Sequence, residues 1–148
     1  MGAARVSERW HEYLMGAAKH AASMSKDGTK VGAVLVGDNK EVLLTSFNGL
    51  PIGVVDDPWR FNRPQKYLYT SHAESSLIAF AARNGISTNG KKVYVTHHPC
   101  SSCARTLIQA GICEIVVGNG KTNMPDEEFE TAAVMFKEAS IRVWKCEN

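Results

Sequence analysis

The chain has 148 residues, the length of one domain, and its 17 basic and 15 acidic side chains leave a net charge of +2. Apolar residues make up 44% and charged residues 22%, which excludes a collagen-like chain, a long disordered chain and a strongly basic nucleic-acid coat protein. Residues 1–11 lack the apolar core of a secretory signal, and no apolar run approaches the roughly 20 residues needed to span a bilayer. We therefore expect a cytoplasmic protein (host cytoplasm if the source is viral) without membrane contact and with reduced thiols.

Hydrophobic spacing predicts a helix, a strand hairpin, and then alternating helices and strands. In chain order the predicted elements are a helix over 5–22, strands over 31–36 and 42–47, a helix over 72–84, a strand over 92–96, a helix over 99–110, a strand over 115–117, a helix over 126–139 and a strand over 141–144. This order predicts an α/β fold, a three-layer α/β/α sandwich with a mixed central sheet, in a single domain over 1–148.

The segment 48–70 interrupts this alternation. It carries several prolines and glycines and shows no clean periodicity. Because a loop of this length in a compact domain is usually functional, we expect this segment to serve the function of the protein.

Two short motifs carry the chemistry: His72-Ala-Glu74, and Pro99-Cys-Ser-Ser-Cys103, with 28 residues from His72 to Cys100. Each motif alone has a simpler explanation. Ser71 and Glu74 have the spacing of a helix capping box, and a lone CxxC is also typical of a redox pair or of two unrelated thiols.

Together the motifs favour a zinc site. His72, Cys100 and Cys103 supply three protein ligands and leave a fourth position for water, as in catalytic zinc centres. Each motif begins a predicted helix, where the helix dipole lowers the pKa of a thiol. The pattern HxE with PCxxC is the signature of zinc deaminases that act on cytosine or adenine, in which the glutamate is the general acid and base. We therefore predict one Zn²⁺ per subunit and Glu74 as the catalytic residue.

The remaining thiols and imidazoles have simpler expected roles. Cys113 and Cys146 have no ligand partners at suitable spacing, so we expect ordinary thiols. A structural zinc would need a fourth protein ligand, for which His97 and His98 are candidates. We expect these two histidines to line a pocket or to pack instead.

The chain resembles the deoxycytidylate (dCMP) deaminases of the cytidine deaminase superfamily over about residues 25–117. The resemblance rests on the segments Ser25-Lys-Asp27, Lys30 to Val36, Asn48-Gly-Leu-Pro-Ile-Gly53, His72-Ala-Glu74, Phe80-Ala-Ala-Arg-Asn-Gly85, Tyr94-Val-Thr96, Pro99 to Ala104 and Leu107 to Ile112. It implies hydrolytic conversion of dCMP to dUMP and ammonia, with Glu74 moving protons between water, the ring N3 and the leaving amine.

The resemblance also implies a substrate site. It suggests that Asn48 holds the sugar hydroxyl and that the backbone near Ala73 contacts the base edge. Ser25 and Lys26 lie in a turn rich in hydrogen-bond donors and positive charge, which suits a phosphate, although Lys26 is equally explained as a solvated turn lysine.

Members of this family are commonly homohexamers that are activated by dCTP and inhibited by dTTP. By resemblance, Gly49, Phe80 and Arg83 are assigned to an effector site, with Mg²⁺ accompanying a triphosphate effector. Phe80 is also explained as a core or interface residue, and Arg83 as a cation at a helix C-terminus.

Three other functions stay open at this point. A tRNA or single-stranded DNA base deaminase would share the zinc and Glu74, but it needs a basic surface that a net charge of +2 does not favour. A free-nucleoside cytidine deaminase would need no phosphate site. From a different class, a catalytically inactive zinc-stabilised binding module would not need Glu74. The near-neutral charge favours a small nucleotide over a polymeric nucleic acid as partner.

Overall fold

The computed structural model describes residues 7–146, which form a five-stranded sheet in the order β2-β1-β3-β4-β5. Strand β1 (Gly32–Val36) pairs antiparallel with both β2 (Val42–Phe47) and β3 (Lys92–His97). Strands β3, β4 (Glu114–Gly120) and β5 (Arg142–Lys145) run parallel to one another. The predicted hairpin and the mixed sheet are therefore confirmed.

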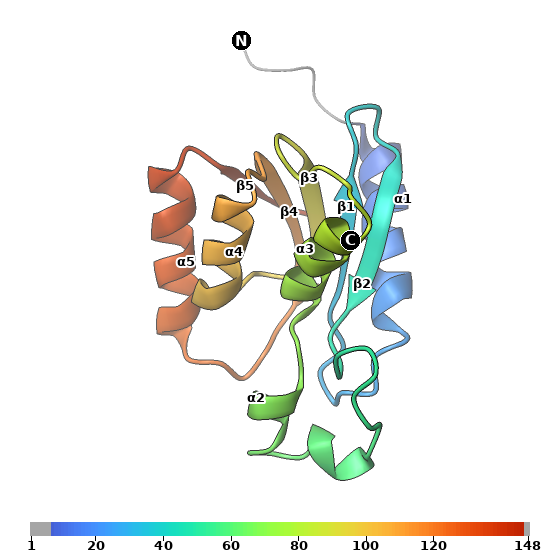
Figure 1. The fold of residues 1–148 in the computed structure, drawn as a ribbon. Helices are drawn as coiled ribbons and strands as arrows, with labels where there is room; N and C mark the ends of the chain where they lie inside the picture. The colour runs from blue at the N-terminus through green and yellow to red at the C-terminus, as the bar shows by residue number, and fades with distance from the viewer. Residues whose placement is uncertain (1–6, 147–148) are drawn as a thin grey trace.

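Helices cover both faces of this sheet (Figure 1). Helix α1 (Glu8–Ala22) packs on one face, against β1, β2 and β3, and is the one helix of residues 7–146 on that side. Helices α3 (Ala73–Arg83), α4 (Ser101–Gln109) and α5 (Asp126–Glu138) lie side by side on the opposite face. This arrangement confirms the predicted three-layer α/β/α sandwich.

The sheet separates two hydrophobic cores. Along β1, every residue is buried, and successive side chains alternate between the faces. Ala33 and Leu35 belong to the core beneath α3, α4 and α5, whereas Val34 and Val36 belong to the core beneath α1. Gly32 allows α1 to approach closely, because a Cβ atom at this position would lie 1.9 Å from the carbonyl oxygen of Ala18.

Several element boundaries differ from the prediction. The first helix begins at Glu8, and Arg5 lies outside the described residues. Strand β4 continues to Gly120, beyond the apolar run at 115–117 on which the prediction depended. His72 and Cys100 are the N-cap residues of α3 and α4 in extended conformation, so both helices begin one residue after these side chains.

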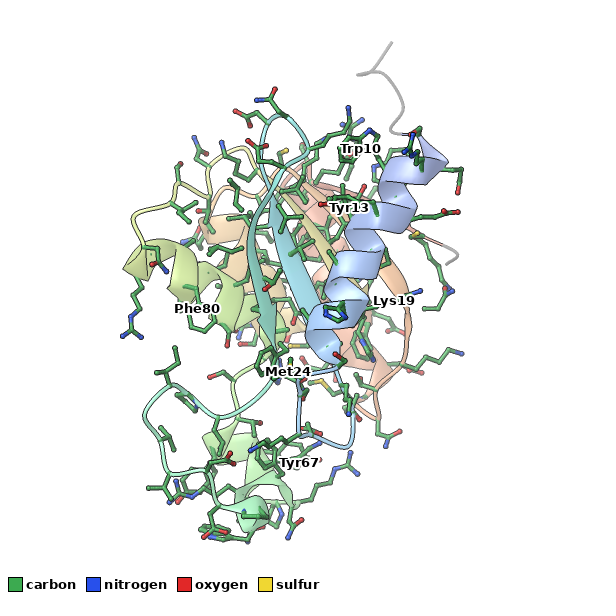
Figure 2. The ribbon with its side chains drawn as sticks, turned by 90° about the vertical axis from the view of Figure 1, so that its right-hand side faces the viewer. Trp10, Tyr13, Lys19, Met24, Tyr67 and Phe80 are labelled. Atoms are coloured by element: carbon green, nitrogen blue, oxygen red, sulfur yellow. The ribbon has the colours of Figure 1, made fainter. Side chains whose placement is uncertain are left out.

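The segment 48–70 contains two short elements that the sequence did not predict. They are a 3-10 helix, η1 (Pro58–Phe61), and the four-residue helix α2 (Lys66–Tyr69). Elements this short do not complete enough turns for a hydrophobic period to be visible. Both lie beyond the end of the sandwich, and Figure 2 shows Tyr67 in this projecting part of the chain. Among the described residues, no helix is long and apolar enough to cross a membrane.

Candidate active site

The two helices that carry the motifs bring His72 and the cysteines together. Helices α3 and α4 are neighbours on the same face of the sheet. His72 is the N-cap of α3, Cys100 is the N-cap of α4, and Cys103 lies in the first turn of α4. Because both helices begin at the same end of the sandwich, side chains that are 28 residues apart in sequence meet there (Figure 1).

The three donor atoms have the spacing of a zinc site. His72 Nδ1 lies 3.3 Å from Cys103 Sγ and 3.5 Å from Cys100 Sγ, and all three donor atoms lie within 4.8 Å of one another. Tetrahedral zinc with ordinary bond lengths to nitrogen and sulfur places such atoms about 3.6 Å apart. An imidazole with two thiolates is also a donor set that zinc favours. The residues present therefore fit zinc and leave its fourth position open.

The two thiols shift each other's pKa in opposite directions. A hydrogen bond from the Cys103 thiol holds the pKa of Cys100 well below its usual range, and the same bond raises the pKa of Cys103. The hydrogen bond to Cys100 also raises the pKa of His72. Since metal ligands must be deprotonated, binding zinc releases these protons. Between residues 7 and 146, His72, Cys100 and Cys103 are the one group of three or more candidate ligands, and the number of zinc ions per subunit stays a prediction.

Polar contacts hold the thiol end of the site in place. The Ser75 hydroxyl lies 3.7 Å from Cys103 Sγ. Glu128 of α5 accepts hydrogen bonds from the backbone N–H of Ser101 at 3.1 Å and from its hydroxyl at 2.6 Å. These bonds keep the pKa of Glu128 below its usual value. Because Ser101 directly follows Cys100, they fix the first turn of α4.

Glu74 is buried beside the donor atoms and faces a pocket. Burial raises its pKa to about 7. A carboxyl group with this pKa accepts and donates protons readily near neutral pH. The alternative capping box is excluded, because the N-cap of α3 is His72 and no side chain caps the helix.

The pocket has a volume of about 300 Å³. It is lined by residues 27, 29, 31, 48, 63, 66, 67, 70, 72–74, 97, 98, 100, 122–125 and 129. His72 and Cys100 both line the pocket; His72 is exposed, whereas Cys100 and Cys103 are buried. A ligand in the pocket therefore reaches the metal site and Glu74 together.

Two of the four predicted substrate residues line this pocket. Asn48 is nearly buried, its Oδ1 accepts from the N–H of Val31 at 2.9 Å, and its Nδ2 donates to the carbonyl oxygen of Thr29 at 2.8 Å. These bonds fix the amide but leave each of its polar atoms capacity for one more hydrogen bond. Ala73 is buried in the pocket wall, and its carbonyl oxygen accepts a hydrogen bond from Ser46 at 2.6 Å.

The other two predicted substrate residues do not line the pocket. Ser25 is buried, and its hydroxyl donates to the carbonyl oxygen of Asn48 at 2.8 Å, so it stabilises the turn that leads to β1. The Lys26 ammonium forms an exposed ion pair with Asp56.

The three residues assigned to an effector site also lie outside the pocket. Gly49 forms an isolated β-bridge with Ser71, just before His72. Phe80 and Arg83 lie on α3, where Phe80 is half-buried and Arg83 is exposed at the last turn (Figure 2 labels Phe80).

His97 and His98 line the pocket and do not belong to the group of candidate metal ligands. The His97 ring lies over Gly120, where a Cβ atom would come within 2.3 Å of it, and burial lowers its pKa. The His98 ring packs edge-on against Phe129 and Phe136. Pocket lining and packing, the expected roles, are thus what the structure shows.

Sequence reasoning missed several pocket residues. Arg63, Lys66 and Tyr67 come from the segment 48–70, and Thr122 to Pro125 follow β4. One usable signal was present: parallel strands end at the same edge of a sheet, so the residues after β4 lie beside the cysteine motif that follows β3. No periodicity indicated which side chains of the long loop turn inward.

A fold of this topology, with a three-donor metal site and a buried carboxyl group at the ends of two helices, has the features of a zinc-dependent hydrolase. The sequence profile described as "Cytidine and deoxycytidylate deaminase zinc-binding region" matches residues 8–119. The chain belongs to this family.

Characterised relatives agree with this assignment. The deoxycytidylate deaminase of Mus musculus is 37% identical over 139 residues, covering 89% of this chain and 76% of the mouse protein. The human deoxycytidylate deaminase is 36% identical with the same two coverages. Among solved structures, the dCMP deaminase of cyanophage S-TIM5 in complex with dCMP and dUMP aligns with a TM-score of 0.78. It covers 96% of this chain and all of the phage chain at 23% identity, a likeness that shows the fold.

Proposed function

We propose that this protein is a zinc-dependent deaminase that hydrolyses dCMP to dUMP and ammonia. The observation that carries the proposal is the position of Glu74, a buried carboxyl group in a nucleotide-sized pocket beside three zinc donor atoms. The names of the mammalian relatives and the dCMP and dUMP bound to the phage protein support the choice of substrate.

Each residue of the site would have a separate role in the reaction. His72, Cys100 and Cys103 would hold zinc, which when bound supplies a Lewis acid that lowers the pKa of water. Glu74 would take one proton from the attacking water and pass it to N3 of the cytosine ring. It would then take the second proton from the same oxygen, now bonded to C4, and give it to the amine, which leaves as ammonia. Asn48 and the backbone at Ala73 would hold the sugar and the base edge, which orients C4 toward the metal.

The test is a substrate panel with the zinc-loaded protein: dCMP, CMP, deoxycytidine, dCTP and a cytosine-containing oligonucleotide. We expect ammonia release to be fastest from dCMP. Glu74→Gln should lower kcat by at least about 10²-fold while zinc content is unchanged, because the amide cannot carry protons. Preference for the oligonucleotide or for deoxycytidine, or near wild-type turnover by Glu74→Gln with zinc bound, would contradict the proposal.

A regulated assembly is a further part of this proposal. The family resemblance predicts a cytoplasmic homohexamer that is activated by dCTP with Mg²⁺ and inhibited by dTTP. Because Gly49, Phe80 and Arg83 lie outside the pocket, an effector at these residues would bind at a site separate from the substrate. Sigmoidal dCMP kinetics that become hyperbolic with dCTP would support regulation, and hyperbolic kinetics insensitive to either nucleotide would exclude it.

A further inference from the structure

The residues around the pocket form two chemically different groups. One group comprises the metal donors and Glu74, which is buried, where α3 and α4 begin at the end of the sandwich. The segment 48–70 contributes Arg63, Lys66 and Tyr67, and Tyr67 is 64% exposed toward solvent. A nucleotide that places its base beside Glu74 would extend its 5′-phosphate away from the buried end, toward this more exposed part of the pocket.

Most cations near the pocket are already neutralised or uncharged. Lys66 Nζ lies 2.9 Å from Asp27 Oδ1, and the two side chains are only 14% and 4% exposed. Breaking such a buried pair would leave an uncompensated charge, so Lys66 stays with Asp27. Burial lowers the pKa of His97, which keeps its ring neutral at pH 7. Lys26 is held by Asp56 and is 65% exposed outside the pocket.

Arg63 differs from these groups. It lines the pocket, and its side chain is exposed. Within residues 7–146, the Arg63 guanidinium makes no ion pair, and none of the side-chain hydrogen bonds or cation–π contacts involves it. The planar guanidinium group of an arginine can donate two parallel hydrogen bonds to two oxygens of a phosphate group, and it is always positively charged. The pocket thus offers one uncompensated, phosphate-matching cation.

We infer that Arg63 binds the 5′-phosphate of the substrate and thereby sets the preference for a nucleoside monophosphate over a nucleoside. The inference rests on the proposed deaminase function and names the residue that makes it specific. The buried Lys66–Asp27 pair joins α2 to the turn before β1, which fixes the segment that carries Arg63. A single such cation also suits one phosphate group better than the backbone of a polymer.

The experiment compares kcat/KM for dCMP and for deoxycytidine in zinc-loaded wild type, Arg63→Ala, Arg63→Lys and Lys30→Ala. Lys30 is the matched control, an exposed lysine between two pocket residues that does not itself line the pocket. We expect Arg63→Ala to lower kcat/KM for dCMP by about 10- to 100-fold, mainly through KM, and to leave deoxycytidine within about twofold. Arg63→Lys should recover part of the loss, and Lys30→Ala should change neither substrate.

Three results would overturn the inference. One is an equal loss on both substrates in Arg63→Ala, which would indicate a structural role. Another is a dCMP-selective loss in Lys26→Ala, assayed in the same way, while Arg63→Ala keeps its preference, which would place the phosphate at Lys26. The third is a wild type that does not distinguish dCMP from deoxycytidine.

A binding measurement separates this inference from the proposed function, because it requires no turnover. Calorimetric titration with dUMP should give at least a tenfold weaker Kd for Arg63→Ala than for wild type. That result would support the Arg63 site even if no cytosine compound released ammonia. Equal Kd values for the two proteins would overturn the Arg63 site even if the enzyme deaminates dCMP.

Discussion

The surroundings of Glu74 favour its neutral form. The carboxyl group is buried at the N-terminal turn of α3, and burial raises its pKa from 4.5 to about 7. A carboxyl group with a raised pKa is suited to proton transfer, but its ionisation lowers the free energy of unfolding. Its pKa in the unfolded chain is the lower of the two, so the folded state binds the extra proton between pH 4.5 and about 7.

This shift predicts how pH changes the stability of the metal-free protein. The favourable contribution of neutral Glu74 is fully present below pH 4.5 and is lost as pH rises to about 7. Glu74→Gln, which cannot ionise, should therefore be more stable than wild type at pH 8, by up to roughly 3 kcal/mol, and should approach wild type near pH 5. Urea unfolding of the chelator-treated proteins at several pH values measures this difference. A constant difference across pH would show that the ionisation of Glu74 is not its cause.

At the residue scale, short motifs can be identified from the sequence more readily than residues that are far apart in the chain but lie close together in the structure. The meeting of His72, Cys100 and Cys103 beside Glu74 could be predicted because each motif is a few residues long and begins a helix, whereas the roles of these residues stay predictions. Arg63 could not, because its place in the pocket depends on the path of the irregular segment 48–70. For Lys26, the sequence suggested a role that the structure does not support. Its charge suits a phosphate, but it pairs with Asp56, which is 30 residues away in the sequence.

At the scale of elements, α5 supports the helix that carries the cysteines. The acidic first turn of α5, Asp126 to Glu128, is explained from sequence by the dipole of α5 itself. The structure shows a second use, because the Glu128 carboxylate accepts two hydrogen bonds from Ser101 at the N-terminus of α4. It thus supplies a cap that neither Cys100 nor any other side chain of α4 provides.

Removing this cap should affect both stability and metal affinity. Glu128→Ala leaves two donors of Ser101 without this partner, so we expect the free energy of unfolding to fall by about 1–2 kcal/mol. Because Cys100 adjoins the freed turn, zinc affinity should fall by about tenfold in a chelator competition. Glu130→Ala, an exposed acidic residue on the same helix, is the control and should change neither value. Unchanged zinc affinity in Glu128→Ala would show that Cys100 is held without this cap.

The types of the longer elements were predictable because hydrophobic spacing continues over the whole element. The ends of these elements were harder to predict. The N-caps of α3 and α4, for example, are a histidine and a cysteine rather than the usual Ser, Thr, Asp or Asn. Strand β4 extends past its apolar run to Gly120, because the ring of His97 lies over this glycine and pairing with β3 continues there. These features depend on contacts between elements and leave no local pattern.

At the scale of the whole molecule, the two faces of the sheet are covered unequally. In the part of the chain that the structure describes, three helices cover one face, whereas α1 alone covers the other and contacts β1, β2 and β3 (Figure 1). Trp144 of β5 is therefore half-exposed, and its indole N–H donates to Glu114 of β4 at 2.7 Å. The alternation of helices and strands predicts the three layers. It does not predict how many strands a single helix covers, because that depends on the side chains that pack between the helix and the sheet.

The arrangement of the metal donors has a consequence for the exchange of zinc. Both sulfur atoms are buried, and His72 and Cys100 line the pocket, so an ion that leaves the site toward solvent crosses the pocket that we propose as the nucleotide site. Bound product should then block the exit of zinc through the pocket. We expect saturating dUMP to slow the removal of zinc by a chelator several-fold, followed with a zinc-sensitive dye, whereas the same concentration of inorganic phosphate should not. If zinc loss proceeds at the same rate with and without dUMP, the metal has a second route out. If dUMP retards it, the rate at which the enzyme inactivates in a metal-poor solution will depend on how much nucleotide surrounds it.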